Sequence, residues 1–377
     1  MKKKVILAFG GHSPEHEVSI ITALQVLDNL EHSKYEVFAI YLDRQQNFFL
    51  LKNLKNKKDF FRSKRLPIVF GKDNRGGYFK IKGSIQRKIY PDVAMLCFHG
   101  GLGESGGLSG FFQSIGIAIT CSDLESSSIS MNKFLSKKIL EGTNINTIQF
   151  EAYRTDCIKQ DLPGVTKSIL KTINLPVIIK PVHFGSSIGI KIARTEIELE
   201  KSLIDTCYLD KEILVERFLE KIEEYNVSVF RYKGDILVSE IEKPKKNDLI
   251  LSYKDKYETG AKKTGKYGMA SLLREVPATL PDELRKKIID QAKLIYEKIG
   301  CFGVVRIDFI LHNSILYFNE INPIPGSLSY YLWEPIGIDF SELLDMIIEN
   351  AIYEKEKQDL VRYEPNDDIV SKFINSD

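Results

Sequence analysis

The run Val304-Val305-Arg306-Ile307-Asp308-Phe309-Ile310 is followed shortly by Ile315-Leu316-Tyr317-Phe318-Asn319-Glu320-Ile321-Asn322-Pro323. Both runs are largely apolar and predict two strands. Glu320 and Asn322 lie two residues apart, so on a strand their side chains share one face. If Asp308 lies on the neighbouring strand, the three oxygen-bearing side chains form a site suited to Mg²⁺ held together with nucleotide phosphates. The alternative is an amphipathic hairpin whose polar side chains face solvent.

The composition is that of a globular protein. The chain has 377 residues, 43% hydrophobic and 28% charged, which suffices for two or three domains. A formal net charge of +2 gives no electrostatic reason to expect nucleic acid or an anionic membrane as the main partner. The five scattered cysteines include no Cys-x-x-Cys pair, which favours buried thiols in a reducing compartment. No run approaches the roughly 18 apolar residues of a membrane span, so we expect a cytoplasmic protein with no membrane partner.

The first third of the chain alternates strand and helix patterns. This order predicts a parallel sheet with helices on its faces. The Lys-, Arg- and Gly-rich stretch over residues 43–90 reads as an insertion. Its basic cluster, residues 52–65, is interpreted as a solvated surface excursion and not a nucleic-acid patch, because the chain is nearly neutral. The predicted strands are residues 5–9, 35–42 and 92–98, and the predicted helix is residues 17–30.

Two further units follow. The second begins near Ser130, the predicted N-cap of a helix over residues 131–141 that Gly142 ends. The third contains a helix over residues 281–299, with Pro at its start and Gly300 behind it. We therefore predict three domains, residues 1–129, 130–225 and 226–377. The predicted strands of the last two are residues 177–180, 212–218, 227–232 and 236–241, and a Lys- and Gly-rich loop covers residues 254–274.

A Gly- and Ser-rich loop follows the predicted strand that ends at Lys180: Pro181-Val182-His183-Phe184-Gly185-Ser186-Ser187-Ile188-Gly189. Small residues let backbone N–H groups approach an anion, serine hydroxyls add donors, and Lys180 can meet a phosphate. The segment does not match the Walker A pattern, which disfavours a P-loop fold. An ordinary hairpin loop remains the alternative. Lys133 is a further candidate phosphate contact or, by itself, a surface lysine.

Two segments with glycines follow strands of the N-terminal sheet, where open α/β sheets bind ligands. In the first, Glu15 offers a carboxylate that can hold a substrate ammonium group, or it complements the dipole of the helix that starts there. In the second, His99-Gly100-Gly101-Leu102-Gly103-Glu104, the histidine can position substrate or assist proton transfer. A hydrogen-bonded structural role for His99 stays open.

Together these segments resemble the D-alanine–D-alanine ligases of the ATP-grasp superfamily. The resemblance implies an α/β fold, α+β in its ATP-binding part, with an N-terminal open parallel-sheet domain followed by a two-part ATP-grasp fold. The matching segments keep a shared order over most of the chain: residues 9–19, 99–104, 130–133, 178–181, 185–189, 256–257, 306–308 and 320–326.

The resemblance also implies residue roles. Arg306 and the backbone N–H of Gly326 would stabilise a tetrahedral oxyanion, and His99 would lie in the catalytic site. Glu15, Ser186 and Tyr257 would form a hydrogen-bonded trio that holds the first substrate's amine. Two Mg²⁺ ions, with Mn²⁺ as an alternative, would be held by Asp308, Glu320 and Asn322. ATP would be bound by Lys133, Lys180, Ser187, Glu216, Glu224 and Lys256, with the lysines on its phosphates and the two glutamates near adenine and ribose.

The implied reaction is the ATP-dependent joining of two D-alanines through an acyl phosphate, for peptidoglycan precursor synthesis. The expected partners are D-alanine or similar amino acids and a second copy of the chain in a homodimer. One alternative is a related ligase that uses D-serine, D-lactate or another amine as second substrate. Another is a non-catalytic ATP-binding protein, which the retained Arg306 and Gly326 disfavour.

The chain departs from the family pattern at four places. Ser105 and Ser109 stand where the family has Asp and Gln, and Tyr331 stands where it has a serine that helps hold the second substrate's carboxylate. Ser327 or Ser329 is a candidate substitute for that serine. The loop over residues 254–274 is longer and more basic than the family's lid. These departures concern the second substrate and leave the ATP-binding residues intact.

Overall fold

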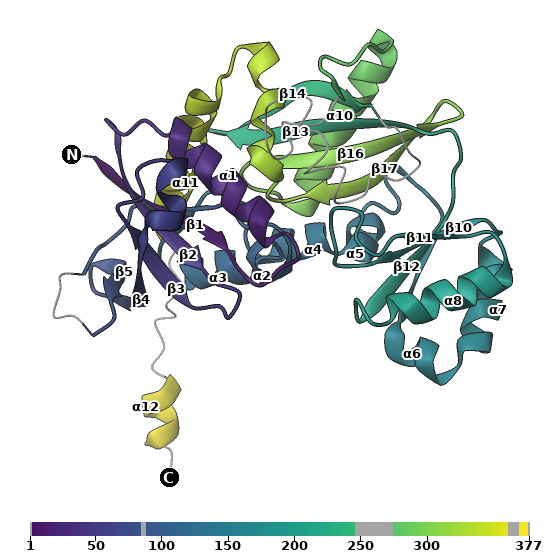
Figure 1. Ribbon diagram of the computed structural model, residues 1–377, viewed down its shortest axis with the longest axis horizontal. Coiled ribbons are helices and arrows are strands. Elements are labelled where there is room, and N and C mark those ends of the chain that lie inside the picture. The colour runs from purple at the N-terminus through teal and green to yellow at the C-terminus, as the bar shows by residue number, and fades with distance from the viewer. Residues whose placement is uncertain (1, 84–87, 246–273, 361–368, 376–377) are drawn as a thin grey trace.

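The computed structural model describes residues 2–83, 88–245, 274–360 and 369–375. Within them the strands form three sheets of seven, four and six strands. In Figure 1 the seven-stranded sheet lies on the left. The six-stranded sheet lies at the upper right, and the four-stranded sheet lies at the lower right. The mixed α/β fold matches the predicted fold class.

The seven-stranded sheet has the order β5-β4-β3-β2-β1-β6-β7. Strand β1 pairs in parallel with β2 and β6, and β6 pairs in parallel with β7, which confirms the predicted parallel arrangement. Residues 5–9 of β1 are fully buried, as expected for a strand covered on both faces. The elements are β1 (Lys3–Gly10), α1 (His16–Asn29), β2 (Tyr35–Leu42), β6 (Val93–Leu96) and β7 (Ala118–Ile119).

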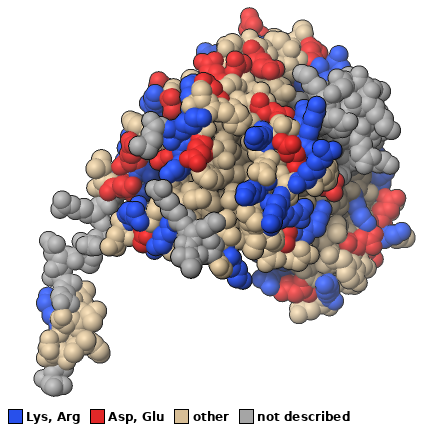
Figure 2. Space-filling view, turned by 60° about the vertical axis from the view of Figure 1, so that its left-hand side comes forward, with Lys and Arg blue, Asp and Glu red and all other residues tan. Residues whose placement is uncertain are grey.

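The insertion over residues 43–90 extends this sheet, and the Lys and Arg side chains of its basic cluster, residues 52–65, are exposed, as predicted. Its strands pair antiparallel in sequence from β2 outward. Phe60, Ile68 and Phe79 are buried, because their apolar side chains pack against the core while the basic ones remain outside. Basic and acidic side chains lie interspersed over the face in Figure 2. The elements are β3 (Phe48–Lys52), η1 (Lys57–Arg62), β4 (Lys64–Asp73) and β5 (Gly76–Ile81).

The C-terminal part of the chain returns to the N-terminal sheet. Helix α11 (Phe340–Asp359) packs against β6, β7 and α1, and Leu343, Leu344 and Ile347 join the same apolar cluster as the buried residues of β1. Helix α12 (Ile369–Ile374) lies apart from the rest in Figure 1.

Two short helices, α2 (Gly101–Glu104) and α3 (Gly107–Ser114), follow β6 in the N-terminal part of the chain. The three predicted domains, residues 1–129, 130–225 and 226–377, stay a prediction.

Two helices replace the single one predicted over residues 131–141. Helix α4 (Leu124–Met131) starts after Asp123, and α5 (Lys133–Lys138) starts after Asn132, whose side chain accepts from two backbone N–H groups of the first turn. Ser130 lies inside α4 and donates its hydroxyl to Ser126 O, so its prediction as an N-cap is wrong. Asparagine is the more effective cap at this break because its carboxamide oxygen reaches both N–H groups.

The four-stranded sheet has the order β11-β10-β12-β9, with all pairs antiparallel. Helices α6, α7 and α8 lie together beside this sheet in Figure 1. Strand β11, and no helix, follows the Gly- and Ser-rich loop, as expected. The elements are β9 (Phe150–Arg154), α6 (Thr155–Gln160), α7 (Leu162–Thr172), β10 (Val177–Pro181), β11 (Lys191–Ala193), α8 (Glu196–Thr206) and β12 (Glu212–Arg217).

The six-stranded sheet has the order β15-β14-β13-β16-β17-β8. Helix α10 (Asp282–Ile299) buries Ile288, Ala292 and Ile295 and ends at Gly300 in a left-handed conformation, which confirms the predicted helix. The elements are β8 (Asn146–Thr147), β13 (Glu223–Tyr232), β14 (Asp235–Pro244), β15 (Arg274–Glu275), β16 (Val305–His312), β17 (Ile315–Asn322), η4 (Gly326–Leu332) and η5 (Glu334–Ile336). Of the helices in the described ranges, none combines the length and the apolar character needed to cross a membrane.

Candidate active site

The strand register places the polar residues of β16 and β17 opposite each other. Asp308 lies opposite Glu320, and Arg306 lies opposite Asn322. On the other side of β16, Asp308 lies opposite Asn226 of β13. Opposed residues of an antiparallel pair point to the same face of a sheet. The predicted facing of Asp308, Glu320 and Asn322 is therefore confirmed, and the hairpin with outward polar side chains is not what forms.

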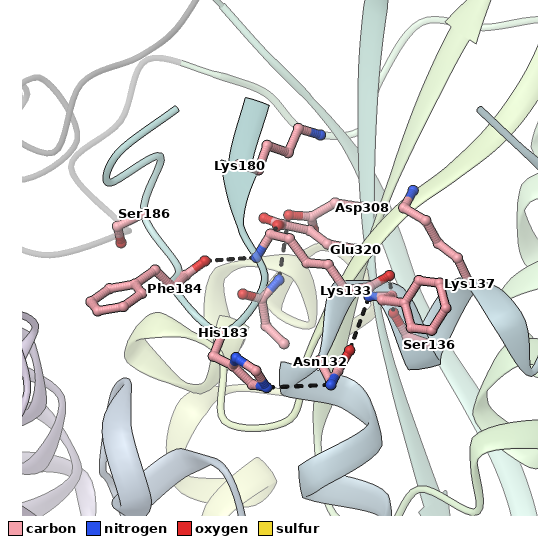
Figure 3. A network of polar contacts seen from close by, with 12 residues as sticks. Asn132, Lys133, Ser136, Lys137, Lys180, His183, Phe184, Ser186, Asp308 and Glu320 are labelled. Atoms are coloured by element: carbon pink, nitrogen blue, oxygen red, sulfur yellow. Dashed lines mark hydrogen bonds and ion pairs between the residues drawn. The ribbon is translucent and has the colours of Figure 1, made fainter. Parts of the chain in front are cut away.

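Each carboxylate of this group has a cationic partner. The buried Arg306 donates from Nε and Nη2 to the two carboxylate oxygens of Asp308, each at 2.7 Å. Lys133 Nζ lies 3.3 Å from Glu320 Oε2 and also donates to Phe184 O at 2.7 Å, as Figure 3 shows. Lys133 is thus turned into the site from the start of α5 and is not a surface lysine.

A cavity joins these residues to the N-terminal sheet and to the Gly- and Ser-rich loop. It brings together eight of the predicted site residues from parts of the chain that are far apart in sequence. Asp308 adjoins this group through its contacts with Arg306 and Asn322. The residues that line the cavity are Glu15, His99, Glu104, Ser130, Met131, Lys133, Gly185, Ser186, Arg306, Glu320, Ile321, Asn322, Ile324 and Gly326.

The Gly- and Ser-rich loop contacts the turn before α1. Ser186 Oγ donates to the Glu15 carboxylate, and Ser13 Oγ accepts from Glu15 N at 3.0 Å. A Cβ atom added to Gly185 would lie 3.0 Å from Glu15 Oε2, a tight contact that would require the Glu15 carboxylate to shift. Two members of the predicted trio therefore meet. The third, Tyr257, lies outside the described residues, as does Lys256.

His99 is buried at the end of the N-terminal sheet. Its Nε2 lies 2.8 Å from Thr22 Oγ1, which in turn accepts from Ser327 N at 3.1 Å. Burial lowers the pKa of His99 to about 4, with the charge of Arg306 acting in the same direction. His99 is therefore neutral near pH 7. Its geometry suits a positioning role better than proton donation by an imidazolium.

This pKa predicts a stability effect. Between pH 6.5 and about 4 the unfolded chain protonates His99 and the folded chain does not, so the free energy of unfolding falls as the pH is lowered. The slope is about 1.4 kcal/mol per pH unit for one proton. His99→Gln should reduce that slope, measured by denaturant unfolding at pH 7.5, 6 and 5. An unchanged slope would contradict the assignment of a neutral buried imidazole.

Glu104 is a site residue that we did not predict. It is buried, lines the cavity and accepts from Gly100 N at 2.6 Å. Burial raises the pKa of Glu104 to about 8, and the charge of Glu15 acts in the same direction. Its place in the His-Gly-Gly-Leu-Gly-Glu segment was the available sequence signal. The geometry assigns it to holding the turn that carries His99.

A second polar group lies behind the cavity. Lys180 on β10 pairs with the fully buried carboxylate of Glu216 on β12. Glu224 at the start of β13 is close enough for its charge to act on Lys180. Lys137, which we did not predict, lies 2.9 Å from Glu216 through its Nζ atom. Three of the predicted ATP-binding residues are thus grouped, and Ser187 follows Ser186 in the adjacent loop.

The segment after Gly326 carries Tyr331 at the position where the family has a serine. Tyr331 is buried, its hydroxyl lies 3.4 Å from Glu242 Oε1, and the Arg274 guanidinium lies 3.8 Å from the centre of its ring. Arg274 also pairs with Glu242 at 2.6 Å. The hydroxyls of Ser327 and Ser329 are buried without a hydrogen-bond partner among the described residues. Their substitution for the family serine stays a prediction.

The donor set suits a hard cation. Asp308, Glu320 and Asn322 offer carboxylate and amide oxygens, which Mg²⁺ prefers over nitrogen and sulfur. The described residues contain no group of three or more His, Cys, Asp and Glu side chains that could hold a metal by themselves. A Mg²⁺ ion here would therefore complete its shell with phosphate oxygens and water. The residues fit Mg²⁺ as an ion bound together with a nucleotide.

Comparison with known proteins gives a consistent result. The family model described as D-ala D-ala ligase N-terminus matches residues 4–122, and the one described as D-ala D-ala ligase C-terminus matches residues 139–349. A D-alanine–D-alanine ligase from Thermosipho melanesiensis is 32% identical over 365 residues, which cover 95% of this chain and 96% of the relative.

Solved structures agree in fold. The D-alanine–D-alanine ligase from Coxiella burnetii superposes with a TM-score of 0.80 at 23% identity, covering 95% of this chain and 96% of that one. The Bacillus anthracis enzyme complexed with ATP superposes with a TM-score of 0.67 at 25% identity, covering 94% and 99%. Two family models that together span most of the sequence, and relatives above 30% identity, lead to one conclusion: the chain belongs to the D-alanine–D-alanine ligase family.

Proposed function

We propose that this protein joins two molecules of D-alanine at the expense of ATP, giving D-alanyl-D-alanine, ADP and phosphate. The observation that carries the proposal is the single cavity in which Glu15 and Ser186 lie across from Arg306, Glu320 and Gly326. One side of this cavity offers an anion for an ammonium group. The other offers cations and oxygen donors for phosphate and for a developing oxyanion.

ATP is proposed to bind between the four- and six-stranded sheets, with Lys133 and Lys180 on its phosphates. Lys133 lies beside Glu320 at the cavity and Lys180 pairs with Glu216 behind it, so carboxylates orient both side chains before a phosphate arrives. Glu216 and Glu224 would contact the adenine and ribose. The relative from Bacillus anthracis was solved as a complex with ATP, which supports nucleotide binding by this fold.

The first step is attack by the first D-alanine's carboxylate oxygen on the γ-phosphorus. The O–P bond to ADP breaks, and an acyl phosphate forms. Glu15 and Ser186 would hold the ammonium group of this D-alanine, which fixes the attacking carboxylate in place. Mg²⁺, when bound by Asp308, Glu320 and Asn322, would neutralise the phosphate charge.

The second step is attack by the amine of the second D-alanine on the acyl carbonyl carbon. The tetrahedral oxyanion collapses, phosphate leaves with the bonding electron pair, and the departing phosphate takes up the proton that the amine loses. The Arg306 guanidinium has five N–H donors and uses two of them on Asp308. The remaining donors can reach the oxyanion. The Gly326 backbone N–H is proposed as the second oxyanion donor.

Ser186→Ala tests the ammonium site. The variant removes a hydrogen bond to the Glu15 carboxylate, and hydrogen bonds to charged groups contribute about 1.5–3 kcal/mol. We expect the KM for D-alanine to rise by about tenfold or more, with the KM for ATP nearly unchanged. Steady-state kinetics measure both, and Ser168→Ala on the exposed face of α7 is the matched control. A rise in the KM for ATP alone would place Ser186 on the nucleotide instead.

The reaction itself is tested by phosphate release with ATP, Mg²⁺ and a panel of D- and L-amino acids. Release that requires D-alanine, with the dipeptide seen by mass spectrometry, supports the proposal. No release with any amino acid would refute it. Omitting Mg²⁺ should abolish release, and restoring activity with Mn²⁺ would show that the oxygen-donor site accepts either ion.

A different second substrate is not favoured. The curated relatives that match over most of the chain are named D-alanine–D-alanine ligases. We also propose a cytoplasmic location, where ATP is available and where the free thiols of all five cysteines are stable. A homodimer is proposed from the family resemblance alone, and light scattering of the purified protein would test it.

A further inference from the structure

Lys137 is the most deeply buried lysine among the described residues. Its side chain has no exposed surface, although a lysine ammonium group loses much of its hydration energy when buried. It does not line the cavity. The exposed neighbour Lys138, with 44% of its side chain accessible, shows the ordinary placement on the same helix. A buried cation at this position therefore needs a partner and a reason.

The partner is Glu216. Its Oε1 atom lies 2.9 Å from Lys137 Nζ, and its Oε2 atom contacts Lys180. All three groups are buried, so the carboxylate is held between two ammonium groups away from water. Burial opposes the ionisation of Glu216, but the two lysines outweigh it and hold its pKa at about 2. Burial lowers the pKa of Lys137, and the charge of Glu216 opposes that shift.

Helix α5 sets this geometry. Lys133 and Lys137 lie four residues apart, so they point from one face of the helix toward β17. Lys133 reaches Glu320 at the cavity, and Lys137 donates to Phe318 O at 3.4 Å one pleat further along β17. Figure 3 shows Lys133 and Lys137 on this helix and Lys180 on β10. One helix thus supplies a cation to the cavity and a cation behind it.

We propose that Lys137 is a positioning residue of the nucleotide site, which keeps Glu216 charge-compensated when Lys180 turns to the phosphates of ATP. This rests on the proposed function, in which Lys180 contacts phosphate. Among the described residues Lys180 has one carboxylate partner at contact distance, Glu216, and it would leave this partner in part when it binds phosphate. Without Lys137, that movement would strand a buried carboxylate, which is strongly unfavourable. With Lys137 in place, Glu216 stays paired and keeps its orientation.

Lys137→Met tests the proposal. Methionine has a similar length and no charge, so the packing is largely kept. We expect the Kd and the KM for ATP to rise by about tenfold or more, with the KM for D-alanine within about twofold of wild type. Titration calorimetry with ATP and Mg²⁺ measures the Kd without any turnover. Lys138→Met is the matched control and should bind ATP like the wild type.

A double-mutant cycle separates positioning from simple core support. In Glu216→Gln no buried carboxylate remains for Lys137 to compensate, so adding Lys137→Met should raise the Kd for ATP no further. Lys137→Arg, which keeps the charge, should recover part of the affinity. If Lys137→Met folds poorly, this arginine variant and the cycle in the Glu216→Gln background still decide the question.

The contrary results are distinct. An unchanged Kd for ATP in Lys137→Met, with only a lowered melting temperature, would overturn the role of Lys137 and leave the ligase proposal standing. Equal losses from Lys137→Met in the wild-type and Glu216→Gln backgrounds would also overturn it. ATP binding by the wild type without D-alanine-dependent phosphate release would refute the ligase proposal and leave the role of Lys137 standing.

Discussion

Replacing Glu320 by glutamine is expected to lower D-alanine-dependent phosphate release by about 10³-fold or more. Glu320 lies opposite Asp308 and supplies one of the two carboxylates of the oxygen-donor site. Glutamine keeps the shape of the side chain but removes the charge that attracts a divalent cation. Phosphoryl transfer then lacks a neutralised phosphate, and positioning by Lys133 alone does not compensate.

The measurement is the rate of phosphate release as a function of Mg²⁺ concentration, with circular dichroism to confirm folding. The variant should need a higher Mg²⁺ concentration for its residual activity. Glu297→Gln is the matched control and should behave like the wild type. The Glu297 side chain is 55% exposed and forms a surface ion pair with Arg231. Near-normal turnover with an unchanged Mg²⁺ dependence would refute the metal assignment of Glu320.

Replacing Arg306 by lysine should lower kcat by about 10²–10³-fold, as for the loss of an oxyanion donor. Lysine keeps one positive charge beside Asp308, so the buried carboxylate is not left uncompensated. It lacks the planar fork that now donates twice to Asp308 and retains further N–H groups for substrate. The KM for ATP should change little, because Arg306 is not among the proposed phosphate contacts.

A second substitution at the same residue distinguishes chemistry from stability. Arg306→Met would leave the buried Asp308 without a cationic partner and should cost about 3–5 kcal/mol of folding stability, measured by denaturant unfolding. Arg306→Lys should retain most of that stability. Arg285→Lys, in the partly exposed pair with Glu240, is the control for the conservative change. A wild-type kcat in Arg306→Lys would exclude an oxyanion role.

Local patterns were enough for most of the elements near the site. The two largely apolar runs over residues 304–310 and 315–323 predict β16 and β17, and the side-chain period of two places Glu320 and Asn322 on one face. Proline at the start and glycine at the end marked α10 in the same way. These signals depend on backbone geometry within a few residues, and no distant contact was needed to read them.

The errors share a different cause. The near-neutral charge of the chain predicts a solvated excursion for the basic cluster over residues 52–65, but Phe60 within it packs into the core. The break between α4 and α5 was missed because Ser130 and Asn132 both match a cap. In each case the structure depends on contacts with segments that are distant in sequence. Composition and spacing do not contain that information.

The sequence by itself determined the family and the paired strands, and it placed Glu320 and Asn322 on one face of a strand. Those follow from residue types at short spacing and from their order along the chain. Only the tertiary structure decided that Glu15 meets Ser186, that Glu104 supports the turn with His99, and that Lys137 is buried against Glu216. The spacing of four residues from Lys133 puts Lys137 on the same helix face, but it does not show that this face is buried. Burial depends on contacts between segments far apart in the chain, and folding alone brings those segments together.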